Sequence, residues 1–563
     1  MECEKINGQK MALRKAEFEL RGISKIISAE PVVADKQIQL AKWISEYYYC
    51  PLGSILKLML PAKLTITTKL KTNKLANQKL ILAPEISFID KIAKDNKIKD
   101  YKTLHSEQTN KQYDENWLKI KSGEKIIIAT RMALFASFQN LKEIIIEDEH
   151  NDLYKSRQTP RYHAREAALK LAKIWNAKII FKSNTPSVET SWLAENKKIS
   201  LKVSSFTFSP AGGPPSGWQV PSFLVDLRNE LKEKNFSIFS RLLQEKIKTT
   251  LAEKQQIILF INRRGSSTSL LCRDCGFVPR CPNCDVPFVY HLSPVQFRCH
   301  HCGHSELPPI LCPQCLGTRI KYFGTGTQKV ETEFKKLFPN IPVARFDSDT
   351  TKIADAGKEI IEDFNNKKIH VLIGTQIIFN KITQKAPLVA LMLADTLLYI
   401  PDFRSNEKTF QIINHLKNLA GKDFILQTYS PENKAIQYAV KNDYKSFYQE
   451  EIATRHTLGY PPFSQLIKLS FQHKNAKKAE QEAKILTEKL KQQIHNQIKT
   501  NKLTNNQLIT ILGPSPAFIS KIKNKYIWQI ILKSKIADLK LRNQIFQIIP
   551  PDWTIDIDPL QII

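Results

Sequence analysis

Short apolar runs alternate with amphipathic stretches through the middle of the chain. Between residues 125 and 181 the runs KIIIAT, EIIIEDEH and KIIF are separated by polar segments and by the helix-like RYHAREAALKLAKIW. A second series spans residues 327–430, where VARFD, HVLIGT, LVALMLAD and FILQTYS stand between helical stretches such as TQKVETEFKKLF. Nearly continuous apolar strands between helices are typical of parallel sheets that are covered on both faces. The pattern therefore predicts two α/β lobes.

The pattern changes after about residue 450. The apolar runs QLIKLSFQ, LITILG, YIWQIIL and WTIDID have strand character, and a helix is predicted from Asn475 to Ile498. One face of this helix is apolar; its residues are Ala479, Ala483, Leu486, Leu490 and Ile494. We expect a compact α+β domain here, a mostly helical region before residue 63, and a loop across the Pro-, Gly- and Ser-rich residues 205–222.

Length and charge narrow the class of protein. At 563 residues the chain is too long for one hydrophobic core, and its 42% hydrophobic and 25% charged residues are ordinary for a globular protein. The 84 Lys and Arg outnumber the 54 Asp and Glu and leave a net charge of +30, which favours nucleic acid as a partner because each neutralised phosphate releases counterions. The alternative is a solvated, lysine-rich surface. Residues 1–10 contain no signal-peptide core and no apolar run reaches the length of a membrane span, so we expect a cytoplasmic protein without a membrane partner.

Eight of the ten cysteines form four CxxC pairs within residues 272–315. In a reducing compartment such pairs indicate a metal rather than disulfides, and four thiolates complete a closed tetrahedral zinc site. The spacing favours an inner site nested within an outer one; the inner ligands are Cys281, Cys284, Cys299 and Cys302, and the outer ligands are Cys272, Cys275, Cys312 and Cys315. Sequential pairing of the cysteines and an iron–sulfur centre are the alternatives. We expect His300, His301 and His304, which lie among the cysteines, to be surface residues.

Four segments resemble those of the PriA family of bacterial replication-restart proteins, which are superfamily 2 DNA helicases. The first comprises LAPEIS, LHSEQTN and ATRMALFASFQNL, and the second comprises IIIEDEHNDLYKSRQTPRYHAREAA and SNTPSVET. The third is LFINRRG, which runs into the cysteine pairs, and the last comprises GYPPFSQL, LGPSPA and IDIDPL. The N-terminal LRGISKIISAEPVVADKQIQLAKWISEYYYCPLG is similar to the latter part of the family's 3' DNA-binding domain. These segments follow the family's order along nearly the whole chain.

The resemblance implies two RecA-like helicase lobes between two DNA-binding ends, with the zinc module inserted in the second lobe. The expected domains are a partial N-terminal DNA-binding domain (1–63), a degenerate first lobe (64–222), the start of the second lobe (223–271), the two-zinc module (272–315), the rest of the second lobe (316–449) and a C-terminal DNA-binding domain (450–563). Arg263 and Arg264 in the NRRG segment are candidate DNA contacts, with a structural salt bridge as an equal alternative.

The residues that would serve ATP depart from the family's pattern. The sequence contains no G-x-x-x-x-G-K-[ST] phosphate loop, and residues 61–78, where the family places it, read PAKLTITTKLKTNKLANQ. The family's DEEH motif reads Glu147, Asp148, Glu149, His150. The side chains at its first two positions therefore differ from the family's by one methylene each. Leu419 and Lys422 stand where the last helicase motif has arginines that stabilise the transition state. We therefore expect no ATP turnover and interpret residues 147–150 as remnants of an ATP–Mg²⁺ site.

The sequence thus predicts a DNA-binding replication-restart factor without catalytic residues, derived from an ATP-dependent 3'-to-5' helicase. It would recognise stalled or branched forks and their single-stranded DNA. With primosome and helicase-loading proteins and single-stranded DNA-binding protein, it would help to reload the replicative helicase. Two Zn²⁺ ions per chain are the expected cofactors. An active ATP-dependent 3'-to-5' helicase of the primosome is one alternative, and a zinc-scaffolded protein-interaction module without a DNA role is another.

Overall fold

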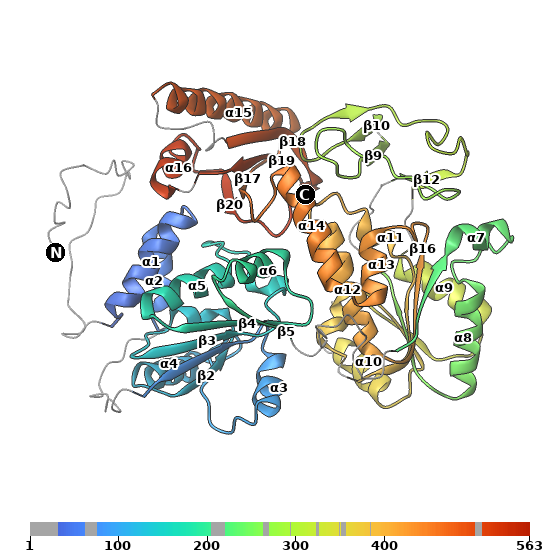
Figure 1. Cartoon of the computed structure of the whole chain (residues 1–563), viewed down its shortest axis with the longest axis horizontal. Coiled ribbons are helices and arrows are strands. Elements are labelled where there is room, and N and C mark those ends of the chain that lie inside the picture. The colour runs from blue at the N-terminus through green and yellow to red at the C-terminus, as the bar shows by residue number, and fades with distance from the viewer. Residues whose placement is uncertain are drawn as a thin grey trace.

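The structure of the chain is a computed structural model. It describes residues 32–61, 76–203, 220–262, 270–292, 294–322, 326–347, 350, 356–382, 384–500, 509–536 and 538–562. These residues form two parallel α/β lobes, a cysteine-rich module that interrupts the second lobe, two N-terminal helices and a C-terminal α+β domain (Figure 1). The fold class predicted from the sequence is confirmed. Of the predicted loop 205–222, only the last three residues lie within the described part of the chain.

The first lobe is a five-stranded parallel sheet with the order β2-β1-β3-β4-β5. Its elements are β1 (Gln78–Leu82), α3 (Ser87–Asp95), α4 (Asn110–Lys121), β2 (Ile126–Ala129), η1 (Arg131–Phe135), β3 (Leu141–Ile146), η2 (Asp152–Tyr154), α5 (Ala164–Trp175), β4 (Lys178–Ser183), α6 (Val188–Glu195) and β5 (Ser200–Val203). Successive strand residues point to opposite faces, so the run of isoleucines in β3 fills two cores. Ile144 and Ile146 pack with α5, whereas Ile145 packs with α3.

The second lobe is a six-stranded parallel sheet with the order β13-β14-β7-β15-β16-β6. Its elements are β6 (Ser222–Asp226), α7 (Leu227–Lys232), α8 (Arg241–Ala252), β7 (Ile257–Phe260), α9 (Thr327–Leu337), β13 (Val343–Phe346), α10 (Ala356–Asn365), β14 (Val371–Gly374), η4 (Gln376–Asn380), β15 (Ala386–Leu391), α11 (Asp395–Leu398), α12 (Ser405–Leu419), β16 (Ala420–Thr428) and α13 (Lys434–Lys441). Strand β7 is buried on both faces, which explains its uninterrupted apolar run. Helix α14 (Tyr444–Leu458) leads from this lobe to the C-terminal domain.

The cysteine-rich module leaves the second lobe after β7 and returns to it at α9. Its short strands are β8 (Leu270–Cys272), β9 (Val289–Leu292), β10 (Val295–Arg298), β11 (Ser305–Glu306) and β12 (Ile320–Tyr322). Strands β8 and β12 pair antiparallel and bring the two ends of the module together. Strands β9, β10 and β11 form a separate small sheet. An insertion built in this way can fold as a unit without disturbing the parallel sheet from which it leaves.

The C-terminal domain is a four-stranded antiparallel sheet that is covered by a long helix. Its elements are β17 (Gln465–His473), α15 (Ala476–Lys499), β18 (Ile509–Ile522), β19 (Lys525–Ser534), α16 (Leu539–Phe546) and β20 (Thr554–Ile557), with the strand order β18-β19-β17-β20. The five apolar residues that were predicted for one face of α15 are all buried. The helix and the buried face that the periodicity predicted are therefore confirmed.

The two ends of the described chain meet beside the first lobe. Helices α1 (Asp35–Tyr47) and α2 (Leu52–Met59) share one buried core with the first lobe and the C-terminal domain. Arg542 of α16 donates to the carbonyls of Glu46 and Tyr47 at 2.9 and 2.6 Å, and Tyr47 Oη donates to Asp558 at 2.8 Å. Figure 1 shows α1 next to α16. Within the described residues, no helix has the length and apolar character that a membrane crossing requires.

Candidate zinc centres and the remnant of a nucleotide site

All four CxxC pairs fold into the same tight turn. In each turn, the residue four positions after the first cysteine donates its backbone N–H to the carbonyl of that cysteine, at 2.8 to 2.9 Å. This residue has a left-handed backbone every time; the four residues are Gly276, Asp285, Gly303 and Leu316, with φ of 81°, 51°, 82° and 57°. Such a turn directs both sulfur atoms of a pair toward one point, which is the geometry that a metal knuckle needs.

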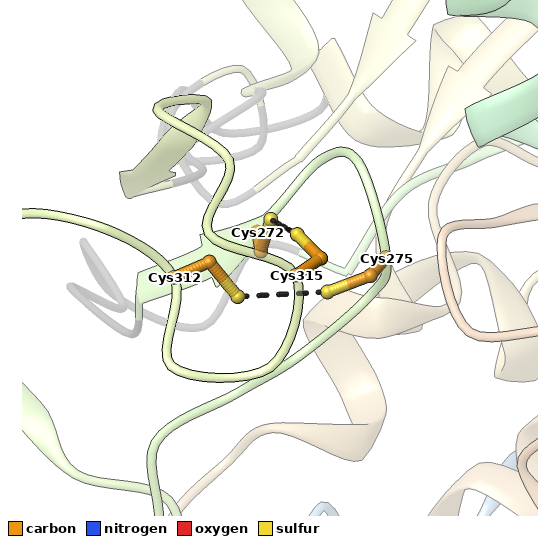
Figure 2. A group of neighbouring side chains, drawn as sticks. All are labelled: Cys272, Cys275, Cys312 and Cys315. Carbon is orange, nitrogen blue, oxygen red and sulfur yellow. Dashed lines mark hydrogen bonds between the residues drawn. The ribbon is translucent and has the colours of Figure 1, made fainter.

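The outer cysteines converge on one point (Figure 2). The Sγ atoms of Cys272, Cys275, Cys312 and Cys315 all lie within 4.8 Å of one another. The Cys272–Cys315 and Cys275–Cys312 sulfur pairs are each 3.6 Å apart. A disulfide is about 2.05 Å long, whereas sulfurs around a tetrahedral zinc ion with bonds of about 2.3 Å lie roughly 3.8 Å apart. The observed spacing therefore fits four thiolates around a zinc ion.

The inner cysteines form a second group of the same kind. The sulfur atoms of Cys281, Cys284, Cys299 and Cys302 also lie within 4.8 Å of one another, and those of Cys281 and Cys302 are 3.6 Å apart. In the described residues the cysteines are thus grouped as inner and outer sets, rather than in sequence order.

Two histidines of the inner module are buried, so their prediction as surface residues was wrong. His300 and His301 lie between Cys299 and Cys302, and neither is exposed to solvent. His300 Nδ1 donates to the carbonyl of Pro516 at 2.8 Å, and His301 Nε2 donates to the carbonyl of Pro401 at 2.7 Å. The knuckle that contains these histidines is therefore packed between the C-terminal domain and the second lobe. Only this long-range packing buries the two rings.

The first residues of the acidic motif follow β3 and contact β4. Glu147 Oε1 lies 2.6 Å from Nζ of Lys182, and both side chains are about four-fifths buried. Asp148 has a left-handed backbone with φ of 45°. His150 Nδ1 lies 2.7 Å from Oγ of Ser183. The carboxylate of Glu147, which the resemblance assigns to magnesium, is thus neutralised by an ammonium group of the chain itself.

The third residue of the motif, Glu149, is fully buried in hydrogen bonds. Its carboxylate accepts from Arg165 at 2.9 Å, from the backbone N–H of Ser187 at 2.6 Å and from Oγ1 of Thr190 at 2.7 Å. A carboxylate that accepts from this many donors is fixed in place. Glu149 therefore ties the end of β3 to the start of α6.

The last helicase motif also makes structural contacts. Leu419 is buried at the end of α12 and is followed directly by β16. Lys422 forms an exposed ion pair with Glu253 at 3.1 Å. Lys417 is buried and donates to the carbonyls of Ala439 and Val440 at 2.9 and 2.8 Å, where it caps the C-terminal end of α13. Each of these side chains therefore serves the second lobe.

Aromatic rings pack between the strands of the second lobe and α12. Phe379 stacks on Phe260 with ring centroids 5.1 Å apart and lies 4.3 Å from the ring of His415. Burial, together with repulsion from His150 of the first lobe, lowers the pKa of His415 to about 4. The ring is neutral at neutral pH and packs as an apolar plane. Glu147, Glu149 and Lys422 are thus already paired within the chain, so these three side chains offer little to a nucleotide with magnesium.

Sequence reasoning missed the partners of the acidic motif. Lys182 was the available signal, because it follows the apolar run KIIF within one strand, where a charge requires a partner. The predicted DNA contacts Arg263 and Arg264 lie outside the described residues. The structure describes how the eight cysteines and residues 147–150 are arranged. The roles proposed for them remain predictions.

Two parallel lobes, the second interrupted by a cysteine-rich module, define a helicase-like protein that carries a zinc-ribbon insertion. Three family models match the chain: the 3' DNA-binding domain at residues 7–61, the cysteine-rich region of PriA DNA helicase at 281–306, and the C-terminal domain of primosomal protein N at 456–560. The replication restart protein PriA of Borreliella burgdorferi is 32% identical over 93% of this chain and 86% of its own length. The chain belongs to the PriA family of replication restart proteins.

Other relatives are longer than this chain. The replication restart protein PriA of Bacillus subtilis is 37% identical over 81% of this chain, which spans 56% of that protein. The corresponding protein of Haemophilus influenzae is 34% identical over 82% of this chain and 62% of its own length. The chain thus spans less than two thirds of these relatives. Zinc binding is supported by the family's cysteine-rich region together with the two four-cysteine groups.

Proposed function

We propose that the protein is a DNA-binding replication-restart factor that recognises stalled or branched replication forks and helps to reload the replicative helicase. The observation that carries this proposal is the order of the family matches. The 3' DNA-binding domain at 7–61 and the C-terminal domain at 456–560 enclose both lobes and the zinc module. The net charge of +30 supports contact with DNA phosphates.

The contact between the two ends supports recognition of a junction. Arg542 of α16 reaches the carbonyl groups at the end of α1, and Tyr47 binds Asp558. The two family domains that would bind DNA are therefore neighbours, although they are far apart in the sequence. A branched DNA brings its arms together at one point, so adjacent binding domains suit it better than a linear duplex.

The proposed cofactors are two Zn²⁺ ions per chain. Cys272, Cys275, Cys312 and Cys315 would hold one ion, and Cys281, Cys284, Cys299 and Cys302 would hold the other. Four thiolates leave no open coordination position, so each ion would be structural rather than catalytic. Their role is to fix the module that joins the second lobe to the C-terminal domain.

We propose that this chain has no helicase activity of its own. Glu147 is paired with Lys182, Glu149 is held by Arg165, and Lys422 is paired with Glu253. In phosphoryl transfer the protein acts by positioning magnesium and charge around the phosphate, and these side chains are already engaged elsewhere. ATP and Mg²⁺ are therefore not among the proposed cofactors.

The proposed partners are the DNA of the fork, primosome and helicase-loading proteins, and single-stranded DNA-binding protein, in the cytoplasm. Family membership supports these partners, and the chain would act by holding a fork while they assemble. A protein that recruits rather than unwinds needs a stable surface, and the shared core of α1, α2, the first lobe and the C-terminal domain supplies one.

The test of this function is the fluorescence anisotropy of labelled DNA with zinc-loaded protein. A fork, a duplex of the same sequence and a single strand are titrated between about 50 and 200 mM salt. We expect the fork to bind about tenfold more tightly than the duplex, because it engages both DNA-binding ends, and all affinities to fall with salt. Equal binding of fork and duplex, or binding that salt does not weaken, would overturn the proposal.

A further inference from the structure

Helix α6 of the first lobe lies beside α14, and polar contacts join the two (Figure 1). The hydroxyl of Tyr444 lies 2.6 Å from Oγ of Ser191 and donates to the carbonyl of Pro186 at 3.0 Å. One turn later, Tyr448 Oη donates to Glu195 at 2.6 Å. Both tyrosines belong to α14, so this helix contacts the whole length of α6.

One carboxylate of α6 lies between two guanidinium groups that come from the second lobe and from α14. Glu189 Oε1 is 2.5 Å from Arg404 and 3.2 Å from Arg455. Burial alone would raise the pKa of Glu189, but these two arginines hold it well below its usual range. The side chain is therefore charged at neutral pH, and its single negative charge faces two cations.

The second-lobe side of this contact is an ion-pair cluster away from water. Arg455 is 1% exposed and lies 2.7 Å from Glu407 and 2.9 Å from Glu451. Arg404 lies 3.3 Å from Glu407, whose carboxylate also accepts from the backbone N–H of Val188 in α6 at 3.0 Å. If the lobes separated, Glu189 of α6 would lose both of its arginines, whereas Arg404 and Arg455 would keep Glu407 and Glu451. Breaking a buried ion pair in this way is strongly unfavourable.

A further ion pair crosses the junction outside this cluster. Lys408 of α12 lies 2.5 Å from Asp152 of η2 in the first lobe. On the second-lobe side, Phe379 and His415 pack against each other near His150 of the acidic motif. Contacts thus join the lobes from the acidic motif through η2 to α6. These contacts are made directly between protein groups, without a bound nucleotide.

We propose that α6, α12 and α14 form a fixed joint that holds the two lobes in one arrangement without a nucleotide. Two-lobed proteins usually close around their ligand by a hinge, and the ligand provides the contacts that favour the closed form. Here protein side chains provide those contacts. The inference goes beyond the proposed function, because fork binding and helicase reloading do not by themselves require a fixed arrangement of the lobes.

The joint explains how a protein without turnover keeps a defined shape. Helix α14 continues into the C-terminal domain, so the contact with α6 also fixes that domain relative to the first lobe. The zinc module is attached to the C-terminal domain through His300 and to the second lobe through His301. A joint that does not open keeps all DNA-contacting parts at constant spacing.

The test is hydrogen–deuterium exchange of the full-length, zinc-loaded protein, alone and with Mg²⁺-ATP or Mg²⁺-ADP-beryllium fluoride. We expect slow exchange of the amides in 188–195 and 444–458, with no change when either nucleotide is added. Glu189→Gln keeps the side-chain size and removes the charge, and we expect exchange in both helices to rise roughly a hundredfold. Glu480→Gln, which removes an exposed ion pair with Lys484 in α15, is the control that should leave both helices unchanged.

A nucleotide-dependent change in the wild-type helices would overturn the proposal. Exchange in Glu189→Gln that is as slow as in the wild type would also overturn the proposal. If that variant does not fold, Tyr448→Phe removes only the hydroxyl contact with Glu195, and we expect about tenfold faster exchange in α6; unchanged exchange there contradicts the joint. Fork anisotropy on the same samples separates the two ideas, because failure to bind a fork leaves the exchange result untouched.

Discussion

The zinc module and the acidic motif are both small clusters of side chains that can bind metal, but they differ in what satisfies those side chains. The four sulfurs of each cysteine group face one another at a spacing that fits a zinc ion. The carboxylates of Glu147 and Glu149 are instead satisfied by Lys182 and Arg165 of the same chain. A ligand site is therefore distinguished from a structural cluster by its internal partners, because a group that is already neutralised has little to gain from a metal.

The same comparison separates what each region does for the fold. The zinc module has only a small core of its own, around Phe288 and Phe297, and depends largely on its metal ligands and on its contacts with neighbouring domains. The acidic motif lies on a sheet that is already buried on both faces. Loss of metal should therefore affect the first region severely and the second region hardly at all.

The largest expected effect is that of a substitution in the inner zinc site. Cys284→Ser removes one thiolate and should lower the zinc content by one ion per chain, with a loss of stability that approaches roughly 10 kcal/mol, as for small zinc folds. Zinc analysis and thermal unfolding measure both. Cys50→Ser, which lies outside both groups, is the control. A Cys284→Ser protein that keeps the same zinc content as wild type would contradict the ligand assignment.

The next effect concerns the acidic motif. Glu149→Gln leaves Arg165 without its buried carboxylate and should cost about 3 kcal/mol in the free energy of unfolding, as for a broken buried ion pair. Denaturant unfolding measures this loss. Glu143→Gln on the same strand breaks the partly exposed pair with Lys79 and should cost less than about 1 kcal/mol. Equal effects would mean that Glu149 is not the structural anchor described here.

A glycine of the outer knuckle tests the fit between the module and the second lobe. A Cβ at Gly276 would lie 2.4 Å from the carbonyl oxygen of Tyr429, and its φ of +81° disfavours any side chain. Gly276→Ala should therefore cost about 2 kcal/mol. Gly53→Ala in α2 meets no atom within 4 Å and should stabilise the chain by roughly 0.5 to 1 kcal/mol. Thermal unfolding of the two variants should shift in opposite directions.

The smallest effect is a pH dependence of the free energy of unfolding, which arises where the first lobe contacts the C-terminal domain. Burial and the neighbouring carboxylate of Asp558 raise the pKa of Glu166 from 4.5 to about 7, although Arg165 opposes this shift. A raised pKa means that Glu166 contributes stability below pH 4.5 and that this contribution is lost as the pH rises through 7.

Glu166→Gln should remove this dependence. The variant should be more stable than wild type at pH 8, by about 1 kcal/mol because the side chain is partly exposed, and nearly equal to it at pH 5. Unfolding temperatures across this range give the result. A difference that is the same at both pH values would show that Glu166 does not titrate between them.

Much of the fold follows from local pattern. Runs of isoleucine and valine predicted the parallel strands, and a single apolar face predicted α15 correctly, because these features depend on neighbours in sequence. The nested grouping of the cysteines could be proposed from spacing, since short loops limit which pairs can meet. The burial of His300 and His301 could not, because it depends on Pro401 and Pro516, which are at least 100 residues away.

The proposed loss of the nucleotide site could be only partly predicted from the sequence. The absence of a phosphate-loop motif and the residues Leu419 and Lys422 predicted that the chain does not turn over ATP. They do not indicate what replaces it. Pairing of Glu147 with Lys182 and of Glu189 with Arg404 and Arg455 requires the sheet and the lobe contact to be in place.

The most direct test of the account is ATP hydrolysis by zinc-loaded protein with saturating fork DNA, with fork binding monitored in the same tube. The account predicts a bound fork and no hydrolysis above the level without protein. Hydrolysis that the fork stimulates, and that survives rigorous removal of contaminating ATPases, would contradict it and would show that the chain forms a nucleotide site from other residues.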